Sequence, residues 1–296
     1  MTELSPILLF TYKRLDTLML TIDALKMNFL AKDSELYIFS DAAKDSRDEP
    51  VIELVRTYLK SINGFKNIYI IEAGHNLGLA KSVIDGVTNI INRYGSVIVL
   101  EDDLITTPNF LNYMNHALSY YASDDSIYSI AGYTSRITNP SQDVYFTKRS
   151  SSWGWGTWKN RWINVNWDVK DYASLSNDSN FKSSFNKMGS DMFKMLKNQM
   201  LGNIDSWAIR WCYNQYLLQT FTVYPTISKV QNIGTGSSAT HTQDRFNRFY
   251  TPLDNSGKIE FEFGSKPVLE PYYLKQFLIQ FSLFTRIKYK ILNKFT

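Results

Sequence analysis

The sequence contains very little cysteine and histidine, and it has no long apolar run. Of its 296 residues, one is cysteine and three are histidine. The single thiol, Cys212, excludes an internal disulfide and suits a reducing compartment such as the cytoplasm. Its aromatic neighbours favour a buried apolar role over a nucleophilic one. No apolar run reaches bilayer-spanning length, and Met1 to Pro6 lacks the basic and apolar regions of a signal peptide.

An excess of basic charge is also absent outside the end of the chain. The net charge is +4, but residues 266–296 hold six basic residues against one acidic residue, which leaves −1 for the rest. Tracking a phosphate backbone needs a clustered basic face on the body, so nucleic acid is not an expected partner. The tail combines this charge with apolar residues from Phe277 to Ile291. Such a basic amphipathic segment fits either an anionic membrane surface or a helix packed on the body.

The remaining composition is that of an ordinary folded protein, with 44% hydrophobic and 20% charged residues. The chain is long enough for one large or two small domains, and it contains no internal repeat or low-complexity linker. We therefore expect one continuous body.

Apolar runs and helical patterns alternate through the first third of the chain. Strands are predicted at 6–12, 36–39, 68–71, 97–100 and 127–133. Helices are expected between them, with Asp16 as a cap, Pro50 in a first turn, and Thr107-Pro108 before a further helix. This alternation predicts an α/β fold with a mostly parallel central sheet flanked by helices. From about residue 134 the pattern changes to polar loops and aromatic clusters.

Three carboxylates, Glu101, Asp102 and Asp103, directly follow the apolar run 97–100. An apolar run without alternation is typical of a strand covered on both faces, and ligands gather at the carboxyl ends of such strands. Crowded carboxylates stay ionised at low cost only beside a cation, and hard oxygen ligands suit Mg²⁺ or Mn²⁺ bridging to phosphates. The triplet therefore predicts a metal–diphosphate site, although a solvated acidic turn would have the same composition.

The second half holds three further groups of residues with alternative interpretations. All seven tryptophans lie between Trp153 and Trp211, where indole rings can stack on sugars or fill a core. Asp205 precedes the apolar helical stretch 207–218, as a helix cap, a general base, or both. The small-residue loop 231–241 ends in His241 and can wrap a diphosphate, but a surface loop would look the same.

The order of these motifs resembles the metal-dependent glycosyltransferases of the GT-A fold, particularly the N-acetylglucosaminyltransferase I type. In that family a Glu-Asp-Asp variant of the Asp-X-Asp motif ends a central strand and leads into a Pro-Asn-Phe helix, as Glu101 to Asp103 and Pro108-Asn109-Phe110 do here. The segment 152–158 is also similar to bacterial transferases of polysaccharide clusters, such as those for capsule and O-antigen. The similarity covers roughly residues 6–245.

The resemblance implies a role for each matching residue. Asp103 would bind the metal, and Glu101 and Asp102 would orient metal-bound water, ribose or the donor sugar. Arg14, after Thr11, and Asp41 match residues that contact uridine. Asn76, Gly78 and Lys81 resemble the donor-holding loop of family-2 glycosyltransferases, and His241 would contact the donor. Asp205 would be the catalytic base, although the related enzymes carry two aspartates before the tryptophan where this chain has Asp205-Ser206-Trp207. Trp153, Trp155 and Trp158 would lie on the acceptor side.

The expected protein is therefore a cytoplasmic GT-A (Rossmann-like) transferase that uses Mn²⁺ or Mg²⁺. It would move a sugar, hexosyl or N-acetylhexosaminyl, from a UDP-linked donor to a glycan or lipid-linked saccharide, with inversion. Residues 1–133 would bind the nucleotide sugar, 134–265 would form the acceptor half, and 266–296 would be a basic amphipathic tail that either binds the inner face of the cytoplasmic membrane or packs on the body. A metal-dependent phosphohydrolase and a non-catalytic carbohydrate-binding protein are the alternatives. A phosphohydrolase of this class usually has its acidic nucleophile at the end of the first strand, where this chain has Phe10-Thr11-Tyr12.

Overall fold

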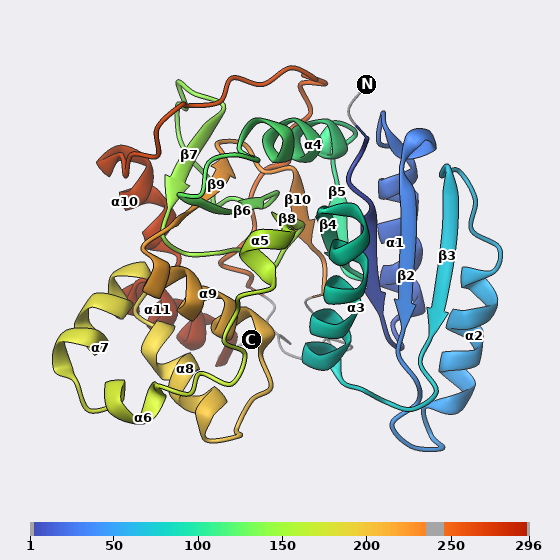
Figure 1. Cartoon of the computed structure of the whole chain (residues 1–296), viewed down its shortest axis with the longest axis horizontal. Helices are drawn as coiled ribbons and strands as arrows, with labels where there is room; N and C mark the ends of the chain where they lie inside the picture. Colours follow the sequence, from blue (N-terminus) through green and yellow to red (C-terminus); the bar gives the residue numbers. More distant parts are fainter. Residues whose placement is uncertain (1–2, 235–245, 295–296) are drawn as a thin grey trace.

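One eight-stranded sheet forms the centre of the protein in the computed structural model, which describes residues 3–234 and 246–294 (Figure 1). Its strand order is β3-β2-β1-β4-β8-β6-β9-β7. A second, two-stranded sheet pairs β5 with β10. The strands are β1 (Ile7–Thr11), β2 (Glu35–Ser40), β3 (Asn67–Glu72), β4 (Ser96–Glu101), β5 (Leu104–Thr106), β6 (Ile127–Ala131), β7 (Val144–Thr147), β8 (Trp155–Trp158), β9 (Phe221–Pro225) and β10 (Val230–Asn232).

The first four strands of the sheet order are parallel, as predicted. Strand β1 pairs in parallel with both β2 and β4, and β2 pairs in parallel with β3. Strand β8 runs antiparallel to β4 and β6, and β7 runs antiparallel to β9. Six of the eight strands therefore share one direction, which confirms the predicted α/β class with a mostly parallel sheet.

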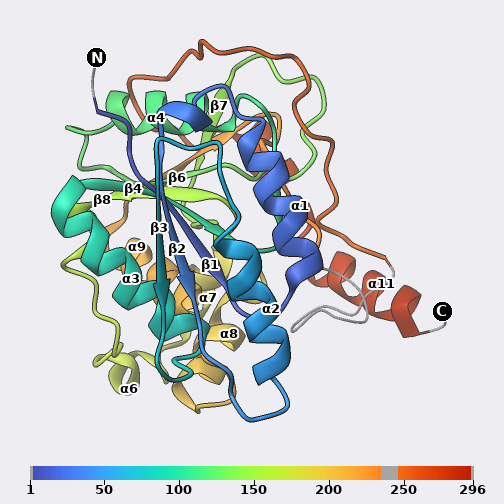
Figure 2. The same cartoon turned by 90° about the vertical axis from the view of Figure 1, so that its right-hand side faces the viewer.

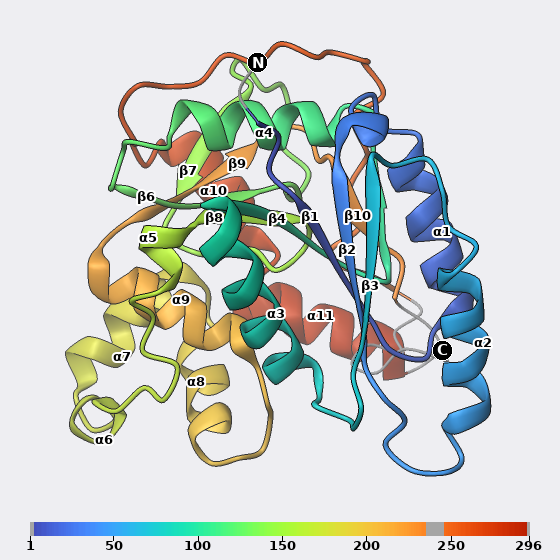
Figure 3. The same ribbon diagram turned by 45° about the vertical axis from the view of Figure 1, so that its right-hand side comes forward.

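Helices cover both faces of this sheet (Figures 2 and 3). Helices α1, α2 and α4 supply apolar side chains to one core, and α3, α5 and α9 supply them to the other. The helices are α1 (Leu15–Lys26), α2 (Glu49–Leu59), α3 (Leu79–Tyr94), α4 (Phe110–Tyr120), α5 (Lys159–Trp162), α6 (Tyr172–Leu175), α7 (Ser179–Phe185), α8 (Met192–Met200), α9 (Trp207–Leu218), α10 (Pro271–Ile279) and α11 (Leu283–Lys294), with 3₁₀ turns at Ala31–Asp33 and Asn186–Met188.

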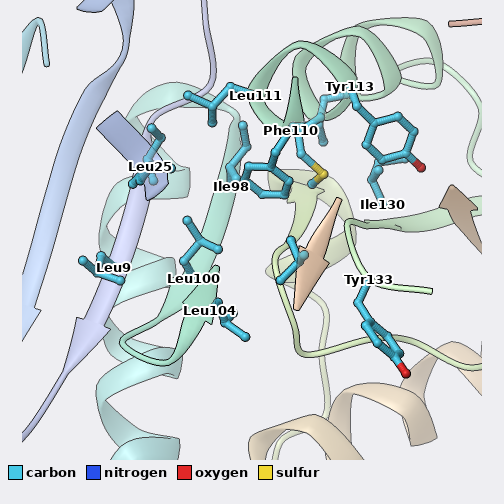
Figure 4. Packing of buried hydrophobic residues seen from close by; sticks show 14 of the residues in the cluster. Leu9, Leu25, Ile98, Leu100, Leu104, Phe110, Leu111, Tyr113, Ile130 and Tyr133 are labelled. Atoms are coloured by element: carbon cyan, nitrogen blue, oxygen red, sulfur yellow. The ribbon is translucent and has the colours of Figure 1, made fainter. Parts of the chain in front are cut away.

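Strand β4 lies in the middle of this arrangement and is buried on both faces. Ile98 and Leu100 join the core under α4, where Phe110 and Leu111 pack against them (Figure 4). Val97 and Val99 point into the opposite core under α3. This explains the apolar run without alternation, since side chains of both faces are removed from water. The acidic triplet therefore begins where a fully buried strand ends.

One of two predicted helix starts differs in detail from its prediction. Pro50 does lie in the first turn of α2, but Arg14 rather than Asp16 occupies the N-cap position of α1, and Asp16 lies in the first turn. The sequence also did not indicate β8, which the tryptophan and glycine segment forms between β4 and β6. Cys212 is buried in an apolar cluster with α7 and α8, as expected. Within residues 3–234 and 246–294, no helix has the length and apolar content needed to cross a membrane.

A buried ion pair anchors the residue before β10. The Lys229 ammonium donates to Asp254, and both side chains are almost completely buried. Asn109 Nδ2 and the Ser256 amide also donate to Asp254, each at 2.9 Å. Burial raises the pKa of Asp254, but the hydrogen bonds, above all that from Lys229, outweigh it and hold the pKa below its usual range. Burial lowers the pKa of Lys229 itself. The pair fixes the entry into β10.

Replacing Lys229 with methionine is expected to destabilise the fold, because it leaves the Asp254 carboxylate buried without its cation. The expected loss is about 3–5 kcal/mol at pH 7, measured by urea unfolding. Asp254 contributes stability above its unfolded pKa and loses it as the pH falls, so the difference between the proteins should shrink towards pH 3. A control variant carrying both Lys229→Met and Asp254→Leu should recover most of the loss. Equal stability of the single variant and the parent at pH 7 would contradict this account.

Candidate functional site

The register of the parallel strands brings the predicted site residues to one edge of the sheet. Thr11 of β1 lies beside Ser40 of β2, and Phe10 lies beside Glu101 of β4. The residues that follow these strand ends therefore emerge together. They are Arg14 after β1, Asp41 after β2, and Asp102 and Asp103 after β4. This is the edge at which parallel α/β sheets bind ligands.

Arg14 bridges the two aspartates. Its guanidinium contacts Asp102 through Nη2 and lies 2.9 Å from Asp103 Oδ2 through Nη1. Burial works to lower the pKa of Arg14, but the charges of Asp102 and Asp103 outweigh it and raise that pKa. Because Arg14 follows β1 and the aspartates follow β4, the pair also ties the two loops together. Its permanent positive charge adds a group that can pair with an anion to an otherwise acidic edge.

The two aspartates have different surroundings. Asp102 Oδ2 accepts hydrogen bonds from Thr11 Oγ1 at 2.9 Å and from the Tyr12 amide at 3.1 Å. Asp102 is thereby held against the end of β1. Asp103 is also buried, but its Oδ1 oxygen has no hydrogen-bond partner among the described residues. A buried carboxylate oxygen without a donor is costly, which marks Oδ1 as the atom that gains most from a ligand.

The electrostatics of Glu101 agree with a cation at this position. Burial and the neighbouring charges of Asp103 and Asp102 raise the pKa of Glu101 to about 8, against a smaller lowering by Arg14. Burial likewise raises the pKa of Asp102. One arginine therefore does not offset three carboxylates, and a divalent cation would favour their ionised forms.

The same carboxylates do not form a complete metal-binding cage. In the described part of the chain, no three His, Cys, Asp or Glu side chains converge to hold an ion. Mg²⁺ in phosphate-binding sites commonly uses one or two carboxylates together with water and phosphate oxygens. The residues present fit a cation that is bound jointly by Asp103 and an oxygen-rich ligand.

Gly234 lies directly against this pair. The amide of Ile233 donates to the Asp103 carbonyl at 2.8 Å, so the chain after β10 runs alongside the Asp103 loop. A Cβ atom on Gly234 would lie 2.1 Å from Asp103 Oδ2 and 2.8 Å from Arg14 Nη1. Only glycine permits this approach. The predicted loop 231–241 thus reaches the acidic residues at its start, and His241 lies outside the described residues.

Asp41 and the loop at 76–78 form a second unit on this edge. Asp41 Oδ1 accepts from the amides of Ala42 and Leu77, and Oδ2 accepts from Asn76 Nδ2 and the Gly78 amide, at 2.9 to 3.1 Å. The carboxylate therefore already has two donors on each oxygen. In this structure Asp41 holds the loop 76–78 in place. The sequence had indicated only a contact between Asp41 and uridine.

The rest of that loop leads into α3. Gly78 is the N-cap with φ of +76°, a conformation that favours glycine. Lys81 pairs with Asp85 one turn later at 2.6 Å, and both side chains are exposed. A polar pocket of about 640 Å³ opens beside the loop, lined by residues including Lys44, Arg56 and Asn76. Arg14 and Asp103 do not line this pocket.

Asp205 lies at the amino end of α9, where it is 65% exposed and pairs with Arg210 Nη2 at 3.0 Å. The N-cap is Ser206, whose Oγ accepts from the Ile209 amide, so the capping interpretation of Asp205 is wrong. Two residues on, Trp207 stacks on Trp155, which lies beside Val99 of β4. This packing connects the Asp205 segment to the strand that carries the acidic triplet.

The three predicted acceptor-side tryptophans have different positions. Trp155 and Trp158 are 1% and 6% exposed, and Trp158 Nε1 donates to the Leu118 carbonyl at 2.9 Å. Both rings fill the core, which corrects the expectation that they contact an acceptor. Trp153 is half-buried and packs edge-on against Tyr133 and Phe249, so it is the one with an accessible surface.

Two contacts at the site had not been expected from the sequence. The Tyr12 amide and the close approach of Gly234 both shape the acidic cluster through the backbone. A backbone amide carries no residue signature, and the glycine was only noted as part of a small-residue loop. Contacts of this kind become visible once the strand register is known.

Comparisons with known proteins give partial structural matches. No protein-family model matches the sequence, and no curated protein matches it. TarS from S. aureus aligns with 46% of this chain and 22% of its own length, at 14% identity and a TM-score of 0.33. The mannosyltransferase PcManGT from Pyrobaculum calidifontis, in complex with GDP-Man and Mn²⁺, aligns with 54% of this chain and 46% of its own length, at 10% identity and a TM-score of 0.39. This chain therefore spans less than half the length of either protein.

Proposed function

We propose that this protein is a metal-dependent glycosyltransferase that moves a sugar from a UDP-linked donor to a hydroxyl of a glycan or lipid-linked saccharide. The observation that carries the proposal is the cluster at the carboxyl ends of β1 and β4. There Arg14 bridges Asp102 and Asp103, and Asp103 Oδ1 lacks a hydrogen-bond partner among residues 3–234 and 246–294. The cluster combines a cation-binding carboxylate with a fixed guanidinium, the pair of charges that a metal-bound diphosphate requires.

Each residue of the cluster has a distinct task in this proposal. Asp103 would hold Mn²⁺ or Mg²⁺ through Oδ1, and Arg14 would bind phosphate or ribose oxygens. Asp102 positions Arg14, because it is itself held by Thr11 and Tyr12. Glu101 would lie near the metal-bound water or donor sugar. When bound, the divalent cation neutralises negative charge on the departing diphosphate as a Lewis acid.

The donor half, residues 1–133, would also use the unit formed by Asp41 and the loop 76–78. The loop is held rigidly by Asp41, so the donor would be bound by preorganised groups such as Asn76 and the first turn of α3. Lys81 lies in that turn and would have to exchange its exposed Asp85 partner for the donor. His241, outside the described residues, would contact the same donor.

The acceptor half, residues 134–265, would contribute the catalytic base. Asp205 is exposed and pairs through Oδ1 with Arg210, so its carboxylate can accept a proton from an acceptor hydroxyl. Attack from the face opposite the leaving diphosphate would invert the anomeric configuration. Trp153 supplies the accessible indole for an acceptor sugar. Synthesis of a bacterial surface polysaccharide, such as capsule or O-antigen, is the process that suits such an acceptor.

The two rival functions have less support in this geometry. A phosphohydrolase of the class considered above would need a carboxylate at the end of β1, which here ends in Phe10-Thr11. A carbohydrate-binding protein would use several exposed indoles, but of the three predicted acceptor-side tryptophans only Trp153 is accessible, since Trp155 and Trp158 are core residues. Neither rival explains why Arg14, Asp102 and Asp103 converge.

A thermal-shift panel tests the proposed function. The protein would be heated with UDP, GDP, UDP-sugars and GDP-mannose, each with and without Mn²⁺. A rise in melting temperature that requires both a uridine nucleotide and Mn²⁺ is expected, because a ligand of the native state stabilises it. Release of free phosphate from nucleotides without an acceptor would favour the phosphohydrolase. A shift with free sugars alone would favour the binding protein.

Gly234→Ala should damage the same site. The new Cβ would overlap Asp103 Oδ2 and push it out of contact with Arg14. We expect Mn²⁺-dependent affinity for UDP to fall by about tenfold or more in calorimetric titration, on the scale of losing a group that orients a metal ligand. Gly264→Ala is the matched control, because its Cβ would make only ordinary contacts with Phe146. Equal affinity of the two variants would show that the close approach does not matter.

A further inference from the structure

Helix α11 presents an apolar stripe to solvent. Leu283, Phe284, Ile287 and Ile291 are 61%, 79%, 49% and 51% exposed. No residue of the helix is buried. Figure 2 shows the ribbon of α11 extending outward from the rest of the molecule. At 100° per residue, the four side chains fall within an arc of about 100°.

The contacts of α11 with the body lie on the other side of the helix. Arg286 Nη1 donates to Ser190 Oγ at 3.0 Å. The Phe246 amide donates to Asn293 Oδ1 at 2.8 Å, and Asn293 Nδ2 donates to the Phe246 carbonyl at 3.1 Å. These polar contacts fix the rotation of the helix, so the apolar stripe faces away from the protein.

The preceding helix explains why α11 holds this position. Tyr273, Phe277 and Phe281 are almost completely buried, and Tyr145 stacks on Tyr273. Helix α10 therefore packs on β7 and β9 and anchors the tail. Of the two interpretations of the tail, packing on the body applies to α10, whereas the apolar stripe of α11 stays exposed among the residues that the structure describes.

The positive charge of α11 indicates what kind of surface the apolar stripe can bind. The helix contains Arg286, Lys288, Lys290 and Lys294 and no acidic residue. By the same helical spacing, Lys288 flanks one side of the stripe, Lys290 flanks the other, and Lys294 ends the helix within the arc of the stripe. A symmetric contact between two copies through the stripe would bring the three lysines of one copy close to those of the other, which is unfavourable. Exposed apolar residues flanked by lysines can instead bind an anionic lipid surface, with the apolar side chains in the membrane and the lysines at the headgroups.

We propose that α11 binds in the plane of an anionic bilayer, with the apolar stripe in the acyl boundary and the lysines among the headgroups. This binding goes beyond the proposed transfer reaction and requires neither nucleotide nor metal. Long lysine side chains can place their ammonium groups at the headgroups while their stems cover apolar surface. The helix would hold the enzyme at the surface on which a lipid-linked acceptor resides.

Vesicle co-sedimentation of the full chain tests the proposal. The vesicles would be phosphatidylcholine alone or an equal mixture with phosphatidylglycerol, at low and at 0.5 M salt. The variant Phe284→Ser/Ile287→Ser removes half of the stripe, and Leu20→Ser/Met27→Ser is its control, with side chains 54% and 70% exposed on and after α1. Lys288→Glu/Lys290→Glu tests the charge, and Lys194→Glu/Lys197→Glu on exposed positions of α8 is its control.

The expected result is binding to the anionic vesicles that weakens in high salt, falls about tenfold or more in both α11 variants, and is unchanged in both controls. Absence of binding to either vesicle would overturn the proposal, as would equal loss in the controls. Concentration-dependent dimerisation that disappears in the Phe284→Ser/Ile287→Ser variant would assign the stripe to a second copy of the chain. Because the assay contains no nucleotide or metal, its outcome is separate from that of the thermal-shift panel.

Discussion

Asp103→Asn should abolish Mn²⁺-dependent binding of UDP while leaving the fold intact. The substitution keeps the shape of a buried side chain but removes the charge of a carboxylate whose Oδ1 has no hydrogen-bond partner in the described part of the chain. It also weakens the contact with Arg14 Nη1. We expect at least about a hundredfold loss of affinity in calorimetric titration with Mn²⁺, because a neutral amide oxygen binds a divalent cation more weakly than an ionised carboxylate does.

The control for this variant is Asp33→Asn, which changes the same charge at an exposed position of the 3₁₀ turn 31–33. It should bind UDP like the parent. Both variants should unfold at similar urea concentrations, since replacing Asp103 also relieves repulsion with Glu101 and Asp102. If metal-dependent affinity is undiminished in Asp103→Asn, Asp103 is not the metal ligand.

Asp205→Asn should separate binding from turnover. The residue lies at the start of α9 with 65% of its side chain exposed, outside the cluster around Arg14. The variant should therefore bind UDP and Mn²⁺ normally but transfer sugar about 10²–10⁴ times more slowly, the usual contribution of a general base. Asparagine can still accept a hydrogen bond from Arg210, so the local structure should persist.

The matched control is Asp168→Asn, an exposed aspartate 3.8 Å from Lys170. It should retain full turnover. The pH profile gives a second readout, because loss of a general base removes the acidic limb from kcat. Near-normal turnover by Asp205→Asn with an unchanged pH profile would place the base elsewhere.

The parallel half of the fold could be predicted because its patterns are local. Continuous apolar runs identify strands such as β1 and β4, and helical spacing identifies α2 and α3. The antiparallel half gave weaker signals. In β8 the strand consists of Trp155-Gly156-Thr157-Trp158, where a glycine and two large rings are equally typical of a loop or a binding site. Only its pairing with β4 and β6 explains this composition.

In the candidate site, too, the individual residues could be predicted from the sequence, but the contacts between them could not. The sequence indicates Asp41 and the segment around Asn76 separately, but not that one carboxylate binds the whole loop. It also indicates Asp103 and Gly234 separately, although they lie 131 positions apart in the chain. In the structure they are so close that a Cβ atom on Gly234 would overlap the Asp103 carboxylate. Such contacts depend on strand register, which a single sequence does not specify at long range.

The most direct test of the account is the binding of Mn²⁺ itself, followed by electron paramagnetic resonance. The signal of free aqueous Mn²⁺ disappears when the ion is bound. We predict that the protein alone takes up Mn²⁺ weakly, since Asp103 provides an incomplete set of ligands, and that UDP strengthens uptake by at least about tenfold. This gain should be absent in Asp103→Asn. Tight Mn²⁺ binding that is indifferent to UDP and survives the loss of Asp103 would contradict the account.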